Sequence, residues 1–416
     1  MDRQHEFNLK EFKNVEEKLA IFGGEPVRDS LLPYGKQSID DQDVRAVVDA
    51  LKSDYITTGP AIEAFEKGVA DYVGAVYAVA FSNGTAALHA ACFAAGIGKG
   101  DEVITTPLTF VASANCVLYT GGKPVFADVD PKTYNIDPSS AASLVTSKTK
   151  AIIPVDFTGQ PADYDKIQAL ADQHGLVVIE DAAHALGSEY KGEKVGSYSD
   201  MTMFSFHPVK HITTGEGGII TTNNRVYYEK LMMFRTHGIT KDPGQMLEKR
   251  HPWEYEMQFL GYNYRMTDLQ AALGSSQLTK LDAFVAKRRA IVSVYNKEFC
   301  QMANVITPEQ LPEANSSHHL YILRMTGTLK GLRKEIFDAL RAENIGVNVH
   351  YMPVHTQPYY KDRGYTKGMC PVAEEVYEGI VSLPLFPGMT ESDVADVVCA
   401  VKKVICHYET AEGAGQ

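Results

Sequence analysis

The chain has 416 residues, with 52 Asp and Glu against 40 Lys and Arg, and a formal net charge of −12. Hydrophobic residues make up 44% and charged residues 22%, which are ordinary globular values and exclude a disordered, collagen-like or coiled-coil chain. The acidic balance argues against a general nucleic-acid binder, which needs a basic face. No apolar run approaches the roughly 18–20 residues of a membrane-spanning helix. The length predicts a large α/β domain with a smaller second one.

The N-terminal residues and the cysteines indicate the cellular compartment. The first residues are charged and lack the apolar stretch of a secretory signal. Six cysteines are spread through the chain without a C-x-x-C pair, so we expect reduced thiols and a cytoplasmic protein. The closest histidine pairs, His207/His211 and His318/His319, come without acidic or thiolate partners, so we expect no metal site.

The first two-thirds of the chain alternates strands and helices. Residues 1–30 are expected to form an N-terminal arm. Residues 38–53 predict a helix with a Ser cap that carries Val44, Val47, Val48 and Leu51 on one face. Between about 77 and 222, helical segments separate the expected strands YAVAF, EVITT, PVFADV, KAIIPV, LVVIED, MTMFSF and GGIITT. Because several of these runs are apolar on both faces, we predict a mainly parallel sheet covered by helices.

The pattern changes after residue 225. Residues 225–238 predict a helix, 240–262 a polar loop, and 267–300 one long helix or two in succession. HLYILRM, GVNVHYM and IVSLPLF then predict strands, accompanied by two helices. The predicted organisation is an arm (1–30), a large α/β domain (31–265), a linking helix (266–300), a small α+β domain (301–410) and a disordered tail (411–416).

Three segments carry residues with chemical potential. Ser82-Asn83-Gly84-Thr85 joins a strand to a helix, whose N-terminus can hold an anion, although taken alone the segment favours a plain capped helix. Glu180-Asp181 ends an apolar strand, where a carboxylate can hold a protonated ring nitrogen, or can equally belong to a solvated loop. Lys210 lies in a Gly-rich loop between strands, where restricted water can give a neutral, imine-forming amine, although taken alone it fits an exposed loop lysine as well.

The order of these segments is more specific than any one of them. With SNGTAAL, IEDAAHALGS, FSFHPVKHITTGEGG, FRTHG and GYNYRMTDLQAALG, the chain resembles the fold-type-I pyridoxal-phosphate enzymes and, among them, the DegT/DnrJ/EryC1/StrS sugar aminotransferases. The similarity runs from about residue 20 to 407. The segments around SFHPVK and NVHYMP are most similar to the branch that forms UDP-4-amino-4,6-dideoxy-N-acetyl-altrosamine on the route to pseudaminic acid.

The resemblance implies a cofactor and its contacts. Lys210 would form the internal aldimine with pyridoxal 5′-phosphate and carry protons, Asp181 would pair with the pyridinium nitrogen, and His184 would pack beside the ring. The remaining implied cofactor contacts are Gly84, Thr85 and Ser205 on the phosphate, Phe110 on the opposite ring face, and Asn263 reaching the neighbouring subunit's phosphate.

The resemblance also implies the reaction and the partners. The enzyme would move an amino group from L-glutamate to C4 of a UDP-linked 4-keto-6-deoxy-N-acetylamino sugar with ping-pong kinetics, as a homodimer with shared active sites. Implied substrate contacts are Tyr34, Asp54, Tyr55, Ile56, Thr57, His350, Tyr351, Met352, Pro353 and Tyr360.

Three alternatives stay open at this point. The first is amination at C3 or C4 of another nucleotide sugar, linked to dTDP or GDP. The second is a dinucleotide-dependent oxidoreductase, against which the missing G-x-G-x-x-G argues. The third is a catalytically silent regulator on the same fold, against which the presence of Lys210, Asp181 and Ser205 argues.

Overall fold

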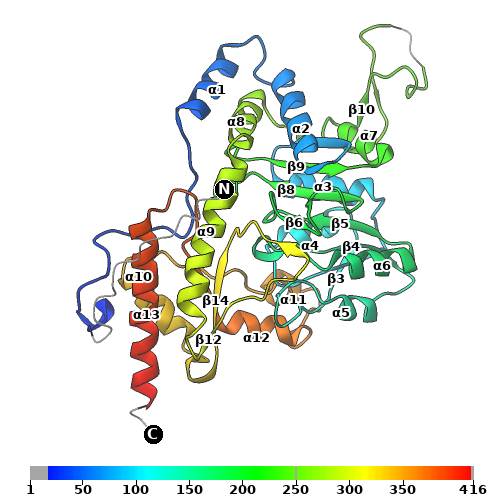
Figure 1. The fold of residues 1–416 in the computed structure, drawn as a ribbon. Coiled ribbons are helices and arrows are strands. Elements are labelled where there is room, and N and C mark those ends of the chain that lie inside the picture. Colours follow the sequence, from blue (N-terminus) through cyan, green and yellow to red (C-terminus); the bar gives the residue numbers. More distant parts are fainter. Residues whose placement is uncertain (1–16, 249–250, 414–416) are drawn as a thin grey trace.

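The computed structural model describes residues 17–248 and 251–413. Its centre is a seven-stranded sheet with the order β1-β9-β8-β5-β4-β2-β3 (Figure 1). The strands are β1 Tyr77–Phe81, β2 Glu102–Thr105, β3 Lys123–Phe126, β4 Thr149–Ile153, β5 Val177–Asp181, β8 Met201–Ser205 and β9 Gly218–Thr222. From β3 to β8 all neighbours run parallel, and β9 alone runs antiparallel to both its neighbours. The predicted mainly parallel α/β sheet is confirmed.

Helices cover both faces of this sheet because alternate residues of its strands are apolar. On one face, Val79 and Ile179 pack in a core with α3 (Gly84–Ala94), α4 (Ala112–Tyr119) and α7 (Arg225–Phe234). On the other face, the adjacent residues Ala78 and Val178 pack in cores that include α2 (Pro60–Val73), α5 (Pro138–Ser143) and α6 (Tyr164–His174). The carboxyl ends of β5 and β8 therefore open at one edge of a sheet that is buried on both faces.

Helix α1 (Asp41–Lys52) differs from the expectation in its cap and its contacts. Asp40, not a serine, forms the cap, and a reciprocal capping box joins it to Asp43. The face that carries Val44, Val48 and Leu51 is exposed. Instead, the fully buried Asp43 accepts hydrogen bonds from the side chains of Ser276 and Gln277 on α8 (Asp268–Leu278). Helix α1 is thus fixed to α8 by polar contacts.

The segment 267–300 forms two helices, α8 and α9 (Leu281–Phe299), which was one of the two predicted possibilities. A second sheet of three strands follows, made of β12 (Val305–Ile306), β14 (Tyr321–Met325) and β15 (Ile380–Leu383). The predicted strand GVNVHYM is wrong, because only Asn348 forms an isolated bridge, to Ser382. Two small sheets consist of short strands. One contains β6 (Glu189–Tyr190), β7 (Glu193–Lys194) and β13 (Ala314–Asn315). In the other, β10 (Ile239–Thr240) pairs antiparallel with β11 (Glu256–Met257), so the predicted polar loop 240–262 contains strand residues.

The C-terminal region has its own core. Helices α10 (Arg333–Ala342) and α13 (Glu391–Gly413) pack with α9 and the second sheet, while α11 (Pro358–Lys361) and α12 (Pro371–Gly379) lie between that sheet and the large one. Leu19 and Leu32, from the start of the described chain, are buried in the same C-terminal core. Helix α13 continues to Gly413, three residues into the segment expected to be disordered. Residues 414–416, and residues 1–16 of the expected arm, lie outside the described part.

None of the helices in the described ranges is long and apolar enough to cross a bilayer.

Candidate active site

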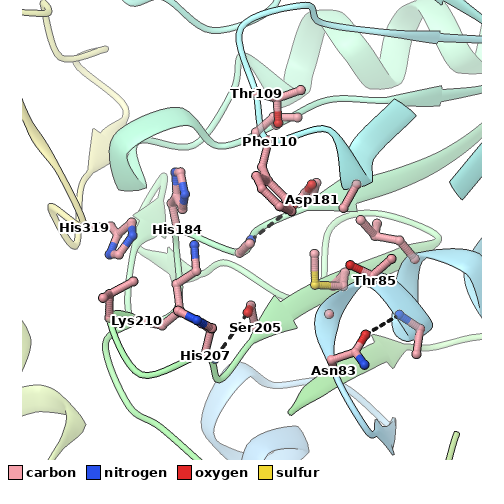
Figure 2. Close-up of a pocket in the computed structure, with 18 of the residues that line it drawn as sticks. Asn83, Thr85, Thr109, Phe110, Asp181, His184, Ser205, His207, Lys210 and His319 are labelled. Carbon is pink, nitrogen blue, oxygen red and sulfur yellow. Dashed lines mark hydrogen bonds between the residues drawn. The ribbon is translucent and has the colours of Figure 1, made fainter. Parts of the chain in front are cut away.

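A cavity of about 750 Å³ opens where β5 and β8 end and α3 begins. It is lined by residues from the large sheet, from the loop after β8 and from the C-terminal region. In Figure 2, Lys210, His184 and His319 lie at one end of this cavity, and Asn83 and Thr85 lie at the other. One end of the cavity thus holds an amine and imidazoles, and the other end holds the start of α3.

The start of α3 forms a place for an anion. The Asn83 side chain caps the helix by accepting from the Ala86 N–H at 2.8 Å. The N–H groups of Gly84 and Thr85 lie in the first turn of α3, so no preceding helical turn offers them a carbonyl acceptor. The positive end of the helix dipole also lies there. A Cβ on Gly84 would lie only 3.3 Å from Met203 Sδ and Ser205 Cβ, so glycine keeps this approach close and open. Ser205, at the end of β8, adds a hydroxyl.

The two carboxylates at the end of β5 point to opposite faces of the sheet, as strand alternation requires. Glu180 is fully buried away from the cavity, where Tyr164 donates to it at 2.5 Å and Thr202 at 2.7 Å. Asp181 lines the cavity and is 5% exposed. Burial raises the pKa of Asp181, while a hydrogen bond from Ser113 at 2.6 Å lowers it. Of the two, only Asp181 can meet a group bound in the cavity.

Lys210 lies in the turn after β8, where its N–H donates to the His207 carbonyl at 2.9 Å. Its amine faces the cavity. Burial lowers the pKa of Lys210 to about 8, the charge of Asp181 opposes that shift, and the buried Arg288 adds to it. The amine therefore loses its proton near physiological pH, which a nucleophile or a proton acceptor requires.

A wall of aromatic rings and imidazoles surrounds the amine. The His184 ring lies 4.4 Å from that of His319 and 6.1 Å from that of Tyr351, and its Nε2 is 3.2 Å from the Tyr351 hydroxyl. Burial lowers the pKa values of His184, His319 and His350, so these rings are neutral at pH 7. Tyr34 packs against His350 at 5.4 Å between ring centres.

The cavity contains ten of the residues named from the sequence. They are Tyr34, Gly84, Thr85, Phe110, Asp181, His184, Ser205, Lys210, His350 and Tyr351. Phe110 is 57% exposed, and the centre of its ring lies 6.3 Å from that of Tyr351.

The other named residues do not line the cavity of their own chain. Asn263 is exposed and bridges to Thr236. Residues 54–57 lie in the turn between α1 and α2, and Met352 and Pro353 lie just beyond the wall residue Tyr351. Tyr360 is 2% exposed and its hydroxyl donates to Asn115 at 2.7 Å, so it packs behind the wall instead of facing a ligand.

The sequence reasoning missed Thr109, Ser113 and His319. Thr109 and His319 line the cavity, and Ser113 supports Asp181 from behind. Ser113 follows Phe110 by three residues on the expected helix, so the one-turn spacing was a usable signal for a shared face. His319 was considered only as a metal ligand, and no local signal links it to Lys210, more than a hundred residues earlier.

Comparisons with known proteins show the family of this chain. A model of the DegT/DnrJ/EryC1/StrS aminotransferase family matches residues 37–402. The chain is 43% identical to the spore coat polysaccharide biosynthesis protein SpsC of Bacillus subtilis, over 91% of this chain and 98% of SpsC. Helicobacter pylori PseC, an aminotransferase involved in the biosynthesis of pseudoaminic acid, matches with a TM-score of 0.85 and 32% identity, over 91% of this chain and all of PseC (100%). The PLP form of Streptococcus pneumoniae Spr1654 has a TM-score of 0.85 and 31% identity, over 91% and 99% of the two chains.

Fold and cavity together define an aminotransferase of the fold-type-I class. The chain belongs to the DegT/DnrJ/EryC1/StrS aminotransferase family, and it is a sugar aminotransferase whose cofactor is pyridoxal 5′-phosphate. The residues present fit that cofactor: an anion cradle at Gly84, a buried carboxylate at Asp181 and a buried amine of lowered pKa at Lys210 share one cavity.

Proposed function

We propose that this enzyme transfers the amino group of L-glutamate to C4 of a UDP-linked 4-keto-6-deoxy-N-acetylamino sugar, as in the altrosamine branch of pseudaminic acid formation. The observation that carries the aminotransferase chemistry is the shared cavity of Lys210, Asp181 and the start of α3. The similarity to PseC, together with SFHPVK and NVHYMP, supports the choice of sugar.

We further propose how the chain holds its cofactor. Gly84, Thr85 and Ser205 would bind the phosphate, since they offer N–H and hydroxyl donors at a positive helix end. Asp181 would pair with the ring nitrogen, and His184 and Phe110 would contact the ring. When bound, pyridoxal phosphate supplies an electron-accepting ring and a place to store the amino group.

Lys210 is the proposed proton carrier. Its Nζ, which is neutral in a large fraction of molecules near pH 8, would accept the proton from Cα of glutamate and later deliver a proton to C4 of the sugar. Because the imidazoles of His184 and His319 are neutral, they place no positive charge beside the Lys210 amine. Tyr34, His350 and Tyr351 would contact the sugar, because they line the cavity beside Lys210.

We propose a homodimer with shared active sites. Asn263 and residues 54–57 do not reach their own cavity. Residues 54–57 lie beside the segment that follows Asn263: Thr57 bridges to Thr267, and the Asp268 N–H donates to the Ile56 carbonyl at 3.1 Å. Tyr55 and Ile56 are 56% and 50% exposed. This surface would complete the cavity of the partner, with Asn263 near its phosphate.

The test is a panel of 4-keto and 3-keto nucleotide sugars, linked to UDP, dTDP and GDP, each incubated with glutamate and the purified enzyme. We expect the UDP-linked 4-keto-6-deoxy-N-acetylamino sugar to have the highest kcat/KM, with one 2-oxoglutarate released per amino sugar formed. A preference for a dTDP or GDP sugar, or for C3, would replace the proposed substrate. Reaction with no member of the panel would remove the nucleotide-sugar assignment.

A further inference from the structure

We propose that Ser113, on α4, is a positioning residue that keeps Asp181 ionised and aimed into the cavity. The proposal rests on the proposed function, in which Asp181 pairs with the ring nitrogen of the cofactor. Ser113 itself does not line the cavity, so it acts on the chemistry only through Asp181.

The geometry fixes both carboxylate oxygens. The Ser113 Oγ donates to Asp181 Oδ2 at 2.6 Å, and the Ala183 N–H donates to Oδ1 at 3.2 Å. Ser113 is completely buried, so water cannot replace its hydroxyl. The hydrogen bond from the Ser113 side chain is thus the shorter of the two.

The hydroxyl has one proton and three nearby acceptors. Besides Asp181, Ser113 Oγ lies 2.8 Å from the Thr109 hydroxyl and 3.2 Å from the Phe110 carbonyl. An ionised carboxylate is the strongest acceptor of these, so the proton belongs to the bond with Asp181. Thr109 then donates to Ser113, and each hydrogen bond in the row polarises the next.

The site needs such a donor because burial raises the pKa of Asp181. A protonated carboxyl could not balance a cationic ring nitrogen. The titratable groups facing Asp181 are Lys210, whose charge helps ionisation, and Tyr351 and Cys116, whose own pKa values are raised so that both stay neutral. Ser113 is therefore a neutral side chain that favours the carboxylate, together with the Ala183 N–H.

The experiment compares two ligands. Full-length enzyme is freed of cofactor, and the affinities for pyridoxal phosphate and for an analogue with CH in place of the ring nitrogen are measured by fluorescence titration across pH. For Ser113→Ala we expect pyridoxal phosphate to bind about 10-fold more weakly, as the loss of a charge-assisted bond predicts. The analogue should bind as to wild type. The pH below which wild type loses its preference for pyridoxal phosphate should rise by about one unit.

Three further variants make the result specific. Ser113→Thr keeps the hydroxyl and should restore the preference. Thr109→Val, which keeps the shape but removes the second hydroxyl of the row, should reduce it in the same direction and by less. Thr120→Val removes a hydroxyl that donates only within the same helix end, to Val117, and should change nothing.

Asp181→Asn separates the role of Asp181 from that of Ser113. It should abolish the preference for pyridoxal phosphate over the analogue. If it does, while Ser113→Ala binds both ligands as wild type does or weakens both equally, the role of Ser113 is overturned and that of Asp181 stands. If Asp181→Asn keeps the full preference, the pairing of Asp181 with the ring nitrogen is overturned, and the role of Ser113 with it.

Discussion

Lys210 has chemical tasks that no neighbouring group can take over. Replacing it with alanine should abolish amination, because no other amine of lowered pKa lines the described cavity. The fold and the binding of cofactor phosphate should persist, since Gly84 and Ser205 are untouched. Turnover and circular dichroism of Lys210→Ala are the measurements, and near-normal steady-state transamination by a folded variant would remove Lys210 from the mechanism.

The pKa of Lys210 itself can be measured. In cofactor-free enzyme, amine-selective labelling of Lys210, followed by mass spectrometry, should increase with pH through a midpoint near 8. The charge of Asp181 raises this pKa, so in Asp181→Asn the midpoint should move to lower pH. Labelling of Lys67, which is largely exposed, provides the reference within the same sample. A midpoint near the ordinary value of lysine, in both proteins, would contradict the role of burial.

The two adjacent carboxylates should respond differently to loss of charge. Asp181→Asn should slow turnover by roughly 100-fold or more, because an amide cannot stabilise a cationic ring nitrogen. Glu180→Gln should leave the turnover of folded enzyme nearly unchanged, since Glu180 contacts Tyr164 and Thr202 on the other face of the sheet. The kcat values of both variants, corrected for the fraction of folded protein, show which carboxylate acts on the cofactor. The reverse ranking would mean that the wrong carboxylate has been assigned to the cofactor.

Among single residues, the sequence predicted those whose positions follow from a general rule of sheet geometry. Asp181 and Ser205 end neighbouring parallel strands, and such ends meet at one edge of a sheet, so their presence in one cavity was predictable. Ser113 and His319 depend on how α4 packs on β5 and on a return of the chain from the C-terminal region. The one-turn spacing from Phe110 indicates the face on which Ser113 lies, but neither its contact with Asp181 nor the position of His319 leaves a local pattern in the sequence.

At the scale of elements, the errors occur where hydrogen bonds go to distant segments. The residues GVNVHYM have strand-like composition, but the Gly346 N–H donates to the Leu32 carbonyl and the Val354 N–H donates to the Pro107 carbonyl. The segment crosses from the small sheet to the cavity wall, so only Asn348 pairs with β15. For α1, the apolar pattern correctly predicted the helix, while burial is determined by Asp43 and its partners on α8.

The junction of α10 with the N-terminal segment makes a stability prediction. Glu343 is fully buried, pairs with Lys403 at 3.0 Å, and accepts from the Ala20 and Val27 N–H groups at 2.9 Å. Glu343→Gln leaves the buried Lys403 ammonium without its counter-charge and should lower the free energy of unfolding by about 3–5 kcal/mol. Urea denaturation of the wild type and of Glu343→Gln measures this difference in the free energy of unfolding.

The matched control is an exposed pair. Asp71→Asn removes the partner of Lys67 at an exposed i,i+4 position and should cost about 0.5 kcal/mol or less. Equal effects of the two substitutions would show that the buried pair contributes no more than a surface one.

At the scale of the whole molecule, the shared site predicts complementation. Asn263→Asp would place a negative charge against the partner's cofactor phosphate, and Lys210→Ala disables the site from its own chain. Neither homodimer should be active. Refolded together in equal amounts, half of the dimers are mixed, and each has one intact site, so activity should return to about a quarter of wild type.

Dimer exchange must be shown separately, with a tag on one variant. If tagged mixed dimers form and the mixture stays as inactive as its parents, Asn263 acts within its own chain. Activity of the Asn263→Asp homodimer close to wild type would instead remove Asn263 from the phosphate site.

The contact between the N-terminal segment and α13 also sets an order in time. Leu19 and Leu32 are buried among residues of α9, α10 and α13, and the Ala20 N–H binds a carboxylate 323 positions later. A ribosome that makes this chain must therefore release nearly all of it before residues 19–32 find their place, whereas the strands around the cavity already have their neighbours by residue 222. The first part of the described chain to be synthesised is thus among the last to be packed, and until then its apolar side chains stay exposed to solvent.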